Sequence, residues 1–329
     1  MRIVEVVILI VVLFSAMLMV VSSRFGYSVS EQRMWKRKHK NCNGRHQSPV
    51  SIHSRRAVPS AIPAIEFIYY HNPLPGPLTI RNNGHSVSLQ TPKAENSTRH
   101  HYHPYIFGGK LRNEYEYVSL HFHWGDKNSR GAEHVLNDIR YPLELHMIHI
   151  NRKYQTIEEA LEHRDGLAVL AFFYQIRENL SNGEEIDNIV KHFSDLNELT
   201  DSVTLPYSFS LQSLIGNINT NRFYTYRGSL TTPTCNEAVT WIIFPDTIPI
   251  SLSQMSKFRS LSNGIEGLLL VDNYRHLQPV GNRKIFLRSI SSRTVELEKI
   301  VEMEMYGRAL ANSRSDSNMT VDDSEWYYN

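Results

Sequence analysis

Two histidines one residue apart, at positions 121 and 123, are the first residues whose spacing suggests chemistry. The segment 119–124 reads Ser-Leu-His-Phe-His-Trp. Side chains alternate across a β-strand, so a strand here puts His121 and His123 on one face and the apolar residues on the other. Paired imidazoles can bind Zn²⁺. A buried histidine in a strand is also commonly an ordinary core residue, so the pair alone leaves both interpretations open.

A second segment could supply a third imidazole. Residues 144–150 read Glu-Leu-His-Met-Ile-His-Ile, which places Glu144, His146 and Ile148 on one face of a strand. If this strand pairs with 119–124, then His121, His123 and His146 can converge. Three neutral imidazoles suit Zn²⁺ and leave its fourth position for water, which is typical of a catalytic site and not of a structural one.

Four other histidines are expected to have no catalytic role. His149 faces away from His146 on the same strand and is predicted to be a core residue. His100, His101 and His103 lie in a polar loop and are predicted to be surface residues. The sequence contains no His-Glu-x-x-His motif, which a helical zinc-protease site would need.

The elements that must position these residues are mostly strands. Turn dipeptides such as Asn-Gly and Gly-Gly recur along the chain and separate short apolar segments. Expected strands are residues 64–70, 86–90, 117–124, 144–150, 167–174, 208–211 and 238–244, with helices at 156–163 and 185–192. The fold class is therefore mainly β with peripheral helices (α+β), in one domain spanning 24–290.

Composition excludes some functions. Among 329 residues, 41% are hydrophobic and 21% are charged, which is typical of a globular chain, and the net charge of +2 gives no basis for a nucleic-acid partner. The cluster Lys-Arg-Lys-His-Lys at 36–40 is expected to be a solvated surface turn, with an anion or membrane patch as the alternative. No obligatory protein partner is evident.

The two ends of the chain differ from its middle. Residues 1–23 carry one early arginine, an apolar run and small residues, and are expected to be a signal peptide; an uncleaved membrane anchor is the alternative. Residues 291–329 form a polar extension, expected to hold one amphipathic helix at 295–306 and otherwise to be mobile.

Other features agree with secretion. Cys42 and Cys235 are the only cysteines, and in an oxidising compartment such a pair forms one disulfide; two free thiols are the alternative for a cytosolic chain. Three glycosylation sequons begin at Asn96, Asn179 and Asn318. The chain is therefore expected to be secreted.

Several spaced motifs now resemble one family, the alpha-class carbonic anhydrases of the secreted, disulfide-containing type. The matching segments are 42–49 (Cys-Asn-Gly-Arg-His-Gln-Ser-Pro), 82–85 (Asn-Asn-Gly-His), 121–125 (His-Phe-His-Trp-Gly), 131–134 (Gly-Ala-Glu-His), 144–146 (Glu-Leu-His), 229–233 (Ser-Leu-Thr-Thr-Pro), 240–241 (Thr-Trp) and 273–279 (Asn-Tyr-Arg-His-Leu-Gln-Pro). The resemblance runs in order from about residue 27 to about residue 290. It implies a large, twisted, mostly antiparallel sheet and a disulfide between Cys42 and Cys235.

The resemblance also implies a reaction and its residues. One Zn²⁺ on His121, His123 and His146 would supply hydroxide at neutral pH, a property for which carbonic anhydrase is the reference case. That hydroxide would attack carbon dioxide and give bicarbonate. Thr231 would orient the hydroxide and donate its own proton to Glu133. His85 would shuttle protons to solvent through water ordered by Tyr27, Asn83 and Ser88.

By the same resemblance, the substrate lies against an apolar wall and the ligands are held by neighbouring groups. The wall is Ile148, Val169, Leu230, Val239 and Trp241, with Thr232 on bicarbonate. Glu144 would accept a hydrogen bond from His146. The backbone carbonyl of Asn273 would accept one from another of the zinc-ligand imidazoles. Ser119 stands where the family usually has glutamine, Ser88 where asparagine is usual and Ile148 where valine is usual. We expect Ser119 to orient His121 more loosely.

Two rival functions remain open from the sequence. One is a carbonic-anhydrase-like binding module at a cell surface, although such proteins typically lack at least one ligand histidine and this chain keeps all three. The other is a zinc hydrolase of esters, for which no acyl-binding pocket or leaving-group acid is apparent.

Overall fold

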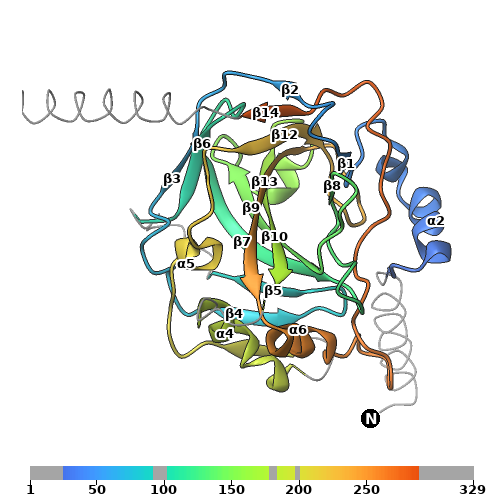
Figure 1. The fold of residues 1–329 in the computed structure, drawn as a ribbon, viewed down its shortest axis with the longest axis vertical. Helices are drawn as coiled ribbons and strands as arrows, with labels where there is room; N and C mark the ends of the chain where they lie inside the picture. Colours follow the sequence, from blue (N-terminus) through green and yellow to red (C-terminus); the bar gives the residue numbers. More distant parts are fainter. Residues whose placement is uncertain (1–24, 92–101, 178–183, 197–200, 289–329) are drawn as a thin grey trace, which may run out of the picture. The chain divides into compact units, whose positions relative to one another are not determined.

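One large sheet organises the computed structural model, which describes residues 25–91, 102–177, 184–196 and 201–288 (Figure 1). Twelve strands form this mixed sheet, and its main path runs β11-β4-β5-β7-β9-β10-β13-β12-β14-β2. The bounds are β2 (Val58–Pro59), β3 (Ile65–Ile68), β4 (Thr79–Asn82), β5 (Val87–Gln90), β6 (Tyr105–Gly108), β7 (Tyr115–Trp124), β9 (Leu143–Asn151), β10 (Leu167–Ile176), β11 (Ser202–Thr204), β12 (Phe223–Gly228), β13 (Val239–Ile250) and β14 (Phe286–Arg288). β1 (Ser51–Ile52) and β8 (Val135–Leu136) form a separate parallel pair.

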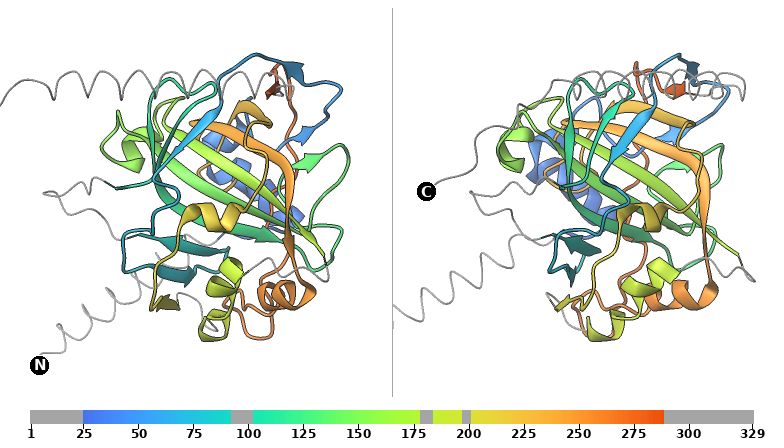
Figure 2. Two further views of the ribbon diagram at one scale, coloured as in Figure 1. Left: turned by 60° about the vertical axis from the view of Figure 1, so that its left-hand side comes forward. Right: turned by 90° about the vertical axis from the view of Figure 1, so that its left-hand side faces the viewer.

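Most neighbours in the large sheet are antiparallel, whereas β10 pairs in parallel with β13 and β14 with β2. Figure 2 shows the strands fanning across the sheet with a pronounced twist. The expectation of a mainly β fold built on a twisted, mostly antiparallel sheet is confirmed.

The central strands β7, β9, β10 and β13 carry a hydrophobic cluster on each face. On β7, Leu120, Phe122 and Trp124 are fully buried in one cluster. On the other face of β10 and β13, Val169 and Trp241 belong to the second cluster. This alternation follows the two-residue period of a strand, and it leaves the histidines of β7 beside the second cluster.

Helices lie over the hydrophobic cluster that contains Leu120, Phe122 and Trp124, called the first cluster here. The helices are α2 (Val29–Lys38), α3 (Ile157–Ala160), α4 (Glu184–Val190), α5 (Leu211–Ile215) and α6 (Leu252–Arg259), with 3₁₀ turns η1 (Lys40–Asn43) and η2 (Phe193–Asp195). Apolar residues of α4, α5 and α6 pack in that cluster, and α4 lies beside α6 in Figures 1 and 2. No helix within the described ranges is long and apolar enough to cross a bilayer.

The Cys42–Cys235 disulfide is present and its Cα atoms are 4.9 Å apart. It ties the segment after α2 to the loop before β13, and Trp35 of α2 packs against both sulfur-bearing residues. The disulfide is therefore part of the contact that holds the N-terminal segment against the sheet domain.

Three local expectations were wrong. Residues 208–211 are not a strand, because Ser210 caps α5 by accepting a hydrogen bond from the Ser213 amide. The basic cluster 36–40 is solvated but is not a simple turn: Lys36–Lys38 form the last turn of α2, where cations suit the helix dipole. His103 is not a surface residue, since it is 8% exposed and its Nδ1 lies 3.7 Å from Glu116 Oε1.

Several expectations concern residues outside the described ranges. They are the signal peptide at 1–23, the sequons at Asn96, Asn179 and Asn318, the histidines His100 and His101, and the extension 291–329 with its helix. The boundaries of the domain at 24–290 also stay a prediction.

His149 is the buried core histidine that the alternation of β9 predicts. Its ring lies in hydrogen-bond contact with the Tyr70 hydroxyl at 2.6 Å and with the Met147 carbonyl at 3.1 Å. Burial lowers the pKa of His149 from 6.5 to about 3, so the ring stays neutral when the chain is folded. In the unfolded chain the same ring takes up a proton below about pH 6.5. The stability contribution of the neutral ring is therefore lost as pH falls from about 6.5 toward 3.

We expect His149→Gln to remove this pH dependence. The difference in unfolding free energy between wild type and variant should shrink by about 1.4 kcal/mol for each pH unit below 6.5. Urea unfolding at pH 7, 6 and 5 measures it. His276 is exposed in the folded protein, so His276→Gln serves as the control. Its unfolding free energy should change with pH in the same way as that of wild type. If the difference in unfolding free energy between wild type and His149→Gln were the same at all three pH values, His149 would not be the source of the pH dependence.

Candidate metal centre

The pairing of β7 with β9 brings the three predicted ligand histidines together. His121 lies opposite His146 in the register, and His123 lies opposite Glu144. One nitrogen of each of His121, His123 and His146 lies within 4.8 Å of the others. His123 and His146 are fully buried, while His121 keeps part of its ring exposed. The three imidazoles therefore form one cluster with access from outside.

Hydrogen bonds decide which nitrogen of each buried ring faces the cluster. His146 Nε2 lies 2.7 Å from Glu144 Oε1, and His123 Nδ1 lies 2.7 Å from the Asn273 carbonyl oxygen. Both oxygens are acceptors, so each of these nitrogens carries the proton in a neutral ring. The other nitrogen, His146 Nδ1 or His123 Nε2, then presents a lone pair inward.

The inward nitrogen of His146 is paired with His121, whereas that of His123 lacks a partner among the described residues. His146 Nδ1 lies 3.3 Å from His121 Nε2, and His123 Nε2 is buried with no hydrogen-bond partner in the described part of the chain. Buried polar atoms are nearly always satisfied, so such an orphan requires an explanation. A cation that accepts all three lone pairs supplies one.

The rings are held in the neutral state that metal ligands need. Burial lowers the pKa of His123 to about 4 and also lowers that of His146. Burial, together with the neighbouring His123 and His146, holds the pKa of His121 well below its usual range. At neutral pH no proton competes for the inward lone pairs.

Glu133 lies beside the cluster and is fully buried. Its Oε1 accepts a 2.7 Å hydrogen bond from the Arg275 amide, and its Oε2 lies 3.5 Å from His123 Nε2. Burial raises the pKa of Glu133, whereas His146, the Arg275 amide and the Thr231 side chain act to lower it. Thr231 is thus close to the carboxylate, although Oε2 lacks a hydrogen bond of good geometry among the described residues.

Glu144 is the centre of a buried network that the sequence analysis only partly anticipated. Besides His146, it contacts His134, whose Nδ1 lies 2.7 Å from Oε1 and whose amide donates to Oε2 at 2.8 Å. Burial alone would raise the pKa of Glu144, but His134 and His146 outweigh it and hold the pKa well below the usual range. The carboxylate is therefore ionised and can fix the tautomer of His146.

The network continues outward from His134. Its Nε2 lies 2.8 Å from the Tyr226 hydroxyl, which in turn lies 2.9 Å from Ser48 Oγ. His134, Glu144 and His146 also place one possible metal-ligand atom each within 4.8 Å of the others. Hydrogen bonding accounts for these contacts, because two of the nitrogens share one carboxylate oxygen. The segment 131–134 signalled this region, but nothing in the sequence indicated the contact with Tyr226.

Asn273 links the cluster to the candidate shuttle. Its carbonyl faces His123, its Oδ1 accepts from the Trp124 amide at 2.7 Å, and its Nδ2 donates to the His85 carbonyl at 2.9 Å. One buried side chain therefore fixes the end of β7 and the loop that carries His85.

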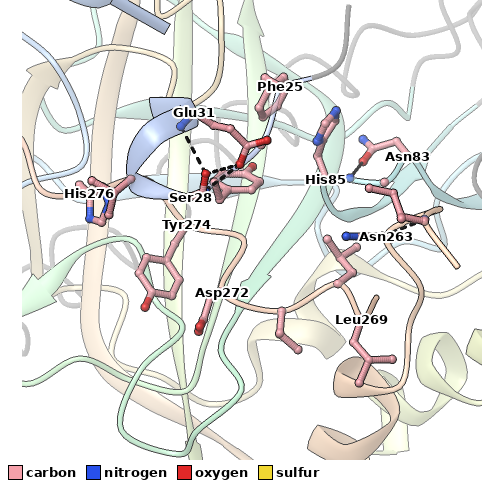
Figure 3. A pocket seen from close by; sticks show the side chains of 17 residues that line it. Phe25, Ser28, Glu31, Asn83, His85, Asn263, Leu269, Asp272, Tyr274 and His276 are labelled. Atoms are coloured by element: carbon pink, nitrogen blue, oxygen red, sulfur yellow. Dashed lines mark hydrogen bonds between the residues drawn. The ribbon is translucent and has the colours of Figure 1, made fainter. Parts of the chain in front are cut away.

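His85 follows a tight turn between β4 and β5. Gly84 has φ 77°, a conformation that favours glycine, and Asn83 Oδ1 accepts from the His85 amide at 2.9 Å. The His85 ring stacks on Phe25 with centroids 3.8 Å apart, and Tyr27 lies 6.4 Å away edge-on. Figure 3 shows the rings of Phe25 and His85 near Asn83 at the edge of a pocket of about 470 Å³. Ser88 lies opposite His121 in the β5–β7 register.

The predicted apolar wall also assembles. Val169 of β10 lies between Ile148 of β9 and Trp241 of β13 in the register. Val239 is fully buried, and Leu230 packs partly exposed against the same cluster. Thr232 is half-buried in the loop after Thr231. These side chains adjoin the histidines because Trp241 is 4.8 Å from His146, centroid to centroid.

Ser119 occupies the position beside His121 on β7, directly opposite Ile148. Within the described ranges, no hydrogen bond joins Ser119 to His121. His123 and His146 each have a partner for their outer nitrogen, whereas His121 lacks one from Ser119. The looser orientation expected for His121 stays a prediction.

Taken as a donor set, three neutral imidazoles with partly exposed access fit Zn²⁺ in a three-ligand site that leaves one position open. The buried carboxylate of Glu133 lies 3.5 Å from His123 Nε2, and the Thr231 side chain acts on that carboxylate. Such an arrangement can activate water and orient it toward a small electrophile.

Comparisons with known proteins agree with this geometry. A family model described as eukaryotic-type carbonic anhydrase matches residues 30–289. Carbonic anhydrase 15 of Mus musculus is 36% identical over 259 residues, covering 76% of this chain and 78% of the relative. Carbonic anhydrase 7 of Mus musculus is 36% identical over 262 residues, covering 76% and 91%, and carbonic anhydrase 6 of Bos taurus is 28% identical over 270 residues, covering 81% and 80%. This chain is therefore an enzyme that belongs to the eukaryotic-type carbonic anhydrase family.

Proposed function

We propose that this enzyme catalyses the zinc-dependent, reversible hydration of carbon dioxide to bicarbonate and a proton. The observation that carries the proposal is the convergence of three imidazole nitrogens, of which His123 Nε2 is buried without a partner among the residues that the structure describes. His121, His123 and His146 would hold the ion. Zinc, when bound, makes a water ligand acidic enough to lose its proton near neutral pH, for which carbonic anhydrase is the reference case.

Glu133 and Thr231 would orient the attacking hydroxide. Glu133, once ionised, is acceptor-only and would accept a hydrogen bond from the Thr231 hydroxyl. The Thr231 oxygen would then be left to accept a hydrogen bond from the attacking hydroxide and so set its orientation toward carbon dioxide. Arg275 supports this arrangement, because its amide fixes Glu133 Oε1 and its guanidinium is anchored by the Ser48 carbonyl at 2.8 Å.

Carbon dioxide has no charge or strong dipole, so its site needs a dry, shaped surface. The register partners Ile148, Val169 and Trp241 supply one next to His146, and Leu230 and Val239 complete it. Thr232 would contact the bicarbonate product. The hydroxide oxygen would form a new bond to the carbon while one C=O π bond breaks and its electrons pass to oxygen, which gives bicarbonate. The proton lost by the water that supplied the hydroxide must then leave the site.

His85 would carry that proton to solvent. An imidazole titrates near neutral pH, so it can accept from water inside and donate to buffer outside. Tyr27, Asn83 and Ser88 would order the intervening water. Burial, with Glu133 nearby, raises the pKa of Tyr27 well above its usual range, so Tyr27 stays a neutral hydroxyl that can both donate and accept.

We infer that the protein acts outside the cell. The Cys42–Cys235 disulfide suits an oxidising compartment, and residues 1–23 have the pattern of a signal peptide. A chain tethered by an uncleaved N-terminal segment is the alternative. Detecting the protein in medium with Arg24 at its N-terminus would support secretion, whereas a membrane-bound product retaining residues 1–23 would favour the tether.

The first prediction tests the reaction itself. His146→Ala should lose stoichiometric zinc and its carbon dioxide hydration should fall to the buffer rate, because two remaining imidazoles cannot hold the ion tightly. Stopped-flow hydration and elemental analysis of the secreted chain measure both. His149→Gln on the same strand is the matched control and should keep zinc and activity. A zinc-loaded, folded wild type with no activity would refute the proposal and favour the binding-module alternative.

The second prediction concerns proton transfer. His85→Ala should lower kcat by about 10- to 100-fold in weakly buffered solution while kcat/KM stays near the wild-type value, because carbon–oxygen bond formation does not use His85. Adding millimolar imidazole buffer should restore kcat. If kcat/KM fell equally, or if imidazole gave no recovery, His85 would be structural and not a shuttle.

The third prediction concerns Ser119. Replacing it with glutamine should supply a partner for the outer nitrogen of His121 and tighten zinc binding by about tenfold, the lower range measured for such supporting groups. Competition with a chromophoric chelator gives the affinity. Ser119→Ala should leave it unchanged, since serine makes no direct bond there. Equal affinity for Ser119→Gln and wild type would show that water already orients His121.

A further inference from the structure

A second cavity, separate from the histidine cluster, lies along β12 and the start of β14. Its volume is about 570 Å³, within the range of small-molecule sites. β12 and β14 are adjacent in the sheet and appear side by side at the top of Figure 1. The loop after β6 and the turn before β10 complete the walls. None of the three candidate zinc ligands lines it.

The lining of this cavity is strongly cationic. Six arginine and lysine side chains face two carboxylates, those of Asp165 and Glu237. The six cations are Lys110, Arg112, Arg164, Arg227, Arg283 and Lys284. Since the whole chain has a net charge of only +2, this concentration of charge is a local feature and not a reflection of composition.

Two carboxylates attract these cations without forming a direct ion pair in the described part of the chain: Asp165 acts on Arg227, and Glu237 acts on Arg283. Among the described residues, the arginines and lysines that form ion pairs are Arg130 and Arg152, which both lie outside the cavity lining. The closest polar contacts of these two carboxylates are to other groups, among them His46, which also lines the cavity. Asp165 Oδ1 accepts from the Tyr154 hydroxyl at 2.8 Å, and Glu237 accepts from the His46 amide and from Gln47 Nε2.

Several of the cations are held in place by groups that carry no net charge. Arg283 donates to the carbonyls of Val280, Arg227, Gln47 and Pro279. Arg227 donates to the Arg164 carbonyl, and Lys110 Nζ lies 3.8 Å from the centroid of the Phe286 ring. These contacts fix the positions of the charges without cancelling them, so a ligand would meet a site that needs little ordering.

The chemistry of the lining selects the kind of anion. Guanidinium groups bind the oxygens of phosphate and sulfate through paired N–H donors, and several cations in one concave site favour a multiply charged ligand. Thr240 also lines the cavity, and its Oγ1 is buried without a partner among the described residues. We propose that this cavity binds a compact polyanion that carries two or more phosphate or sulfate groups.

Isothermal titration of the zinc-loaded full chain tests the proposal, with tripolyphosphate and a fully sulfated heparin disaccharide as probes in 150 mM NaCl. At least one probe should bind with a micromolar Kd. Tighter binding of tripolyphosphate identifies a free phosphorylated compound as the source of the anion. Tighter binding of the disaccharide identifies a sulfated glycan. Either result supports the site, and binding of neither probe would overturn it.

Charge-neutralising variants locate the binding. Arg112 and Lys284 are exposed, so the double change Arg112→Gln/Lys284→Gln should leave the fold intact and weaken binding of the better probe at least tenfold. The matched control is Arg33→Gln/Lys36→Gln on α2, which removes the same charge from exposed positions outside the cavity and should retain wild-type affinity. Equal weakening by both double variants would mean diffuse attraction, and the proposed site would be wrong. Circular dichroism and hydration activity confirm that each variant is folded.

Discussion

The pairing of β7 with β9 is the constraint on which the rest of the candidate site depends. Its register sets His121 opposite His146 and His123 opposite Glu144. A slip of one residue would send the histidines to the helix-covered face and Leu120, Phe122 and Trp124 to the other. The register is secured because those three apolar side chains are fully buried. Hydrophobic packing on one face of the sheet therefore fixes the chemistry on the opposite face.

Hydrogen bonds then convert a cluster of histidines into a donor set. Glu144 and the Asn273 carbonyl each hold the outer nitrogen of one ring, so the inner nitrogens present lone pairs to a common point. The cost of burying Glu144 is offset by His134 and His146, which keep the carboxylate ionised. Asn273 does more than orient His123 through its backbone carbonyl, because its side chain holds the loop of His85. Metal binding and proton exit thus share one structural support.

Polar groups are distributed differently around the histidine cluster and along the cavity beside β12 and β14. Around the histidines, the buried charges are paired or hydrogen-bonded within a few ångströms. Along β12 and β14, by contrast, Arg283 is anchored by backbone carbonyls, and the nearby Glu237 attracts it without a direct ion pair among the described residues. The first arrangement suits a reaction that must exclude bulk water around a neutral substrate. The second suits recognition of an anion at a partly open surface.

The sequence by itself determined the elements and residue types near the metal. The period-two alternation at 119–124 and 144–150 predicted strands with the correct faces, and it also marked His149 as core. Motif order and spacing identified the family. The sequence could not give the partner of a residue far along the chain, such as the contact of His134 with Tyr226 or of Arg275 with Glu133. It also misassigned 208–211, where a capping serine outweighed strand propensity. Only the tertiary structure decided these points, because hydrogen-bond partners and the gathering of Arg and Lys around one cavity depend on which distant segments the sheet brings side by side.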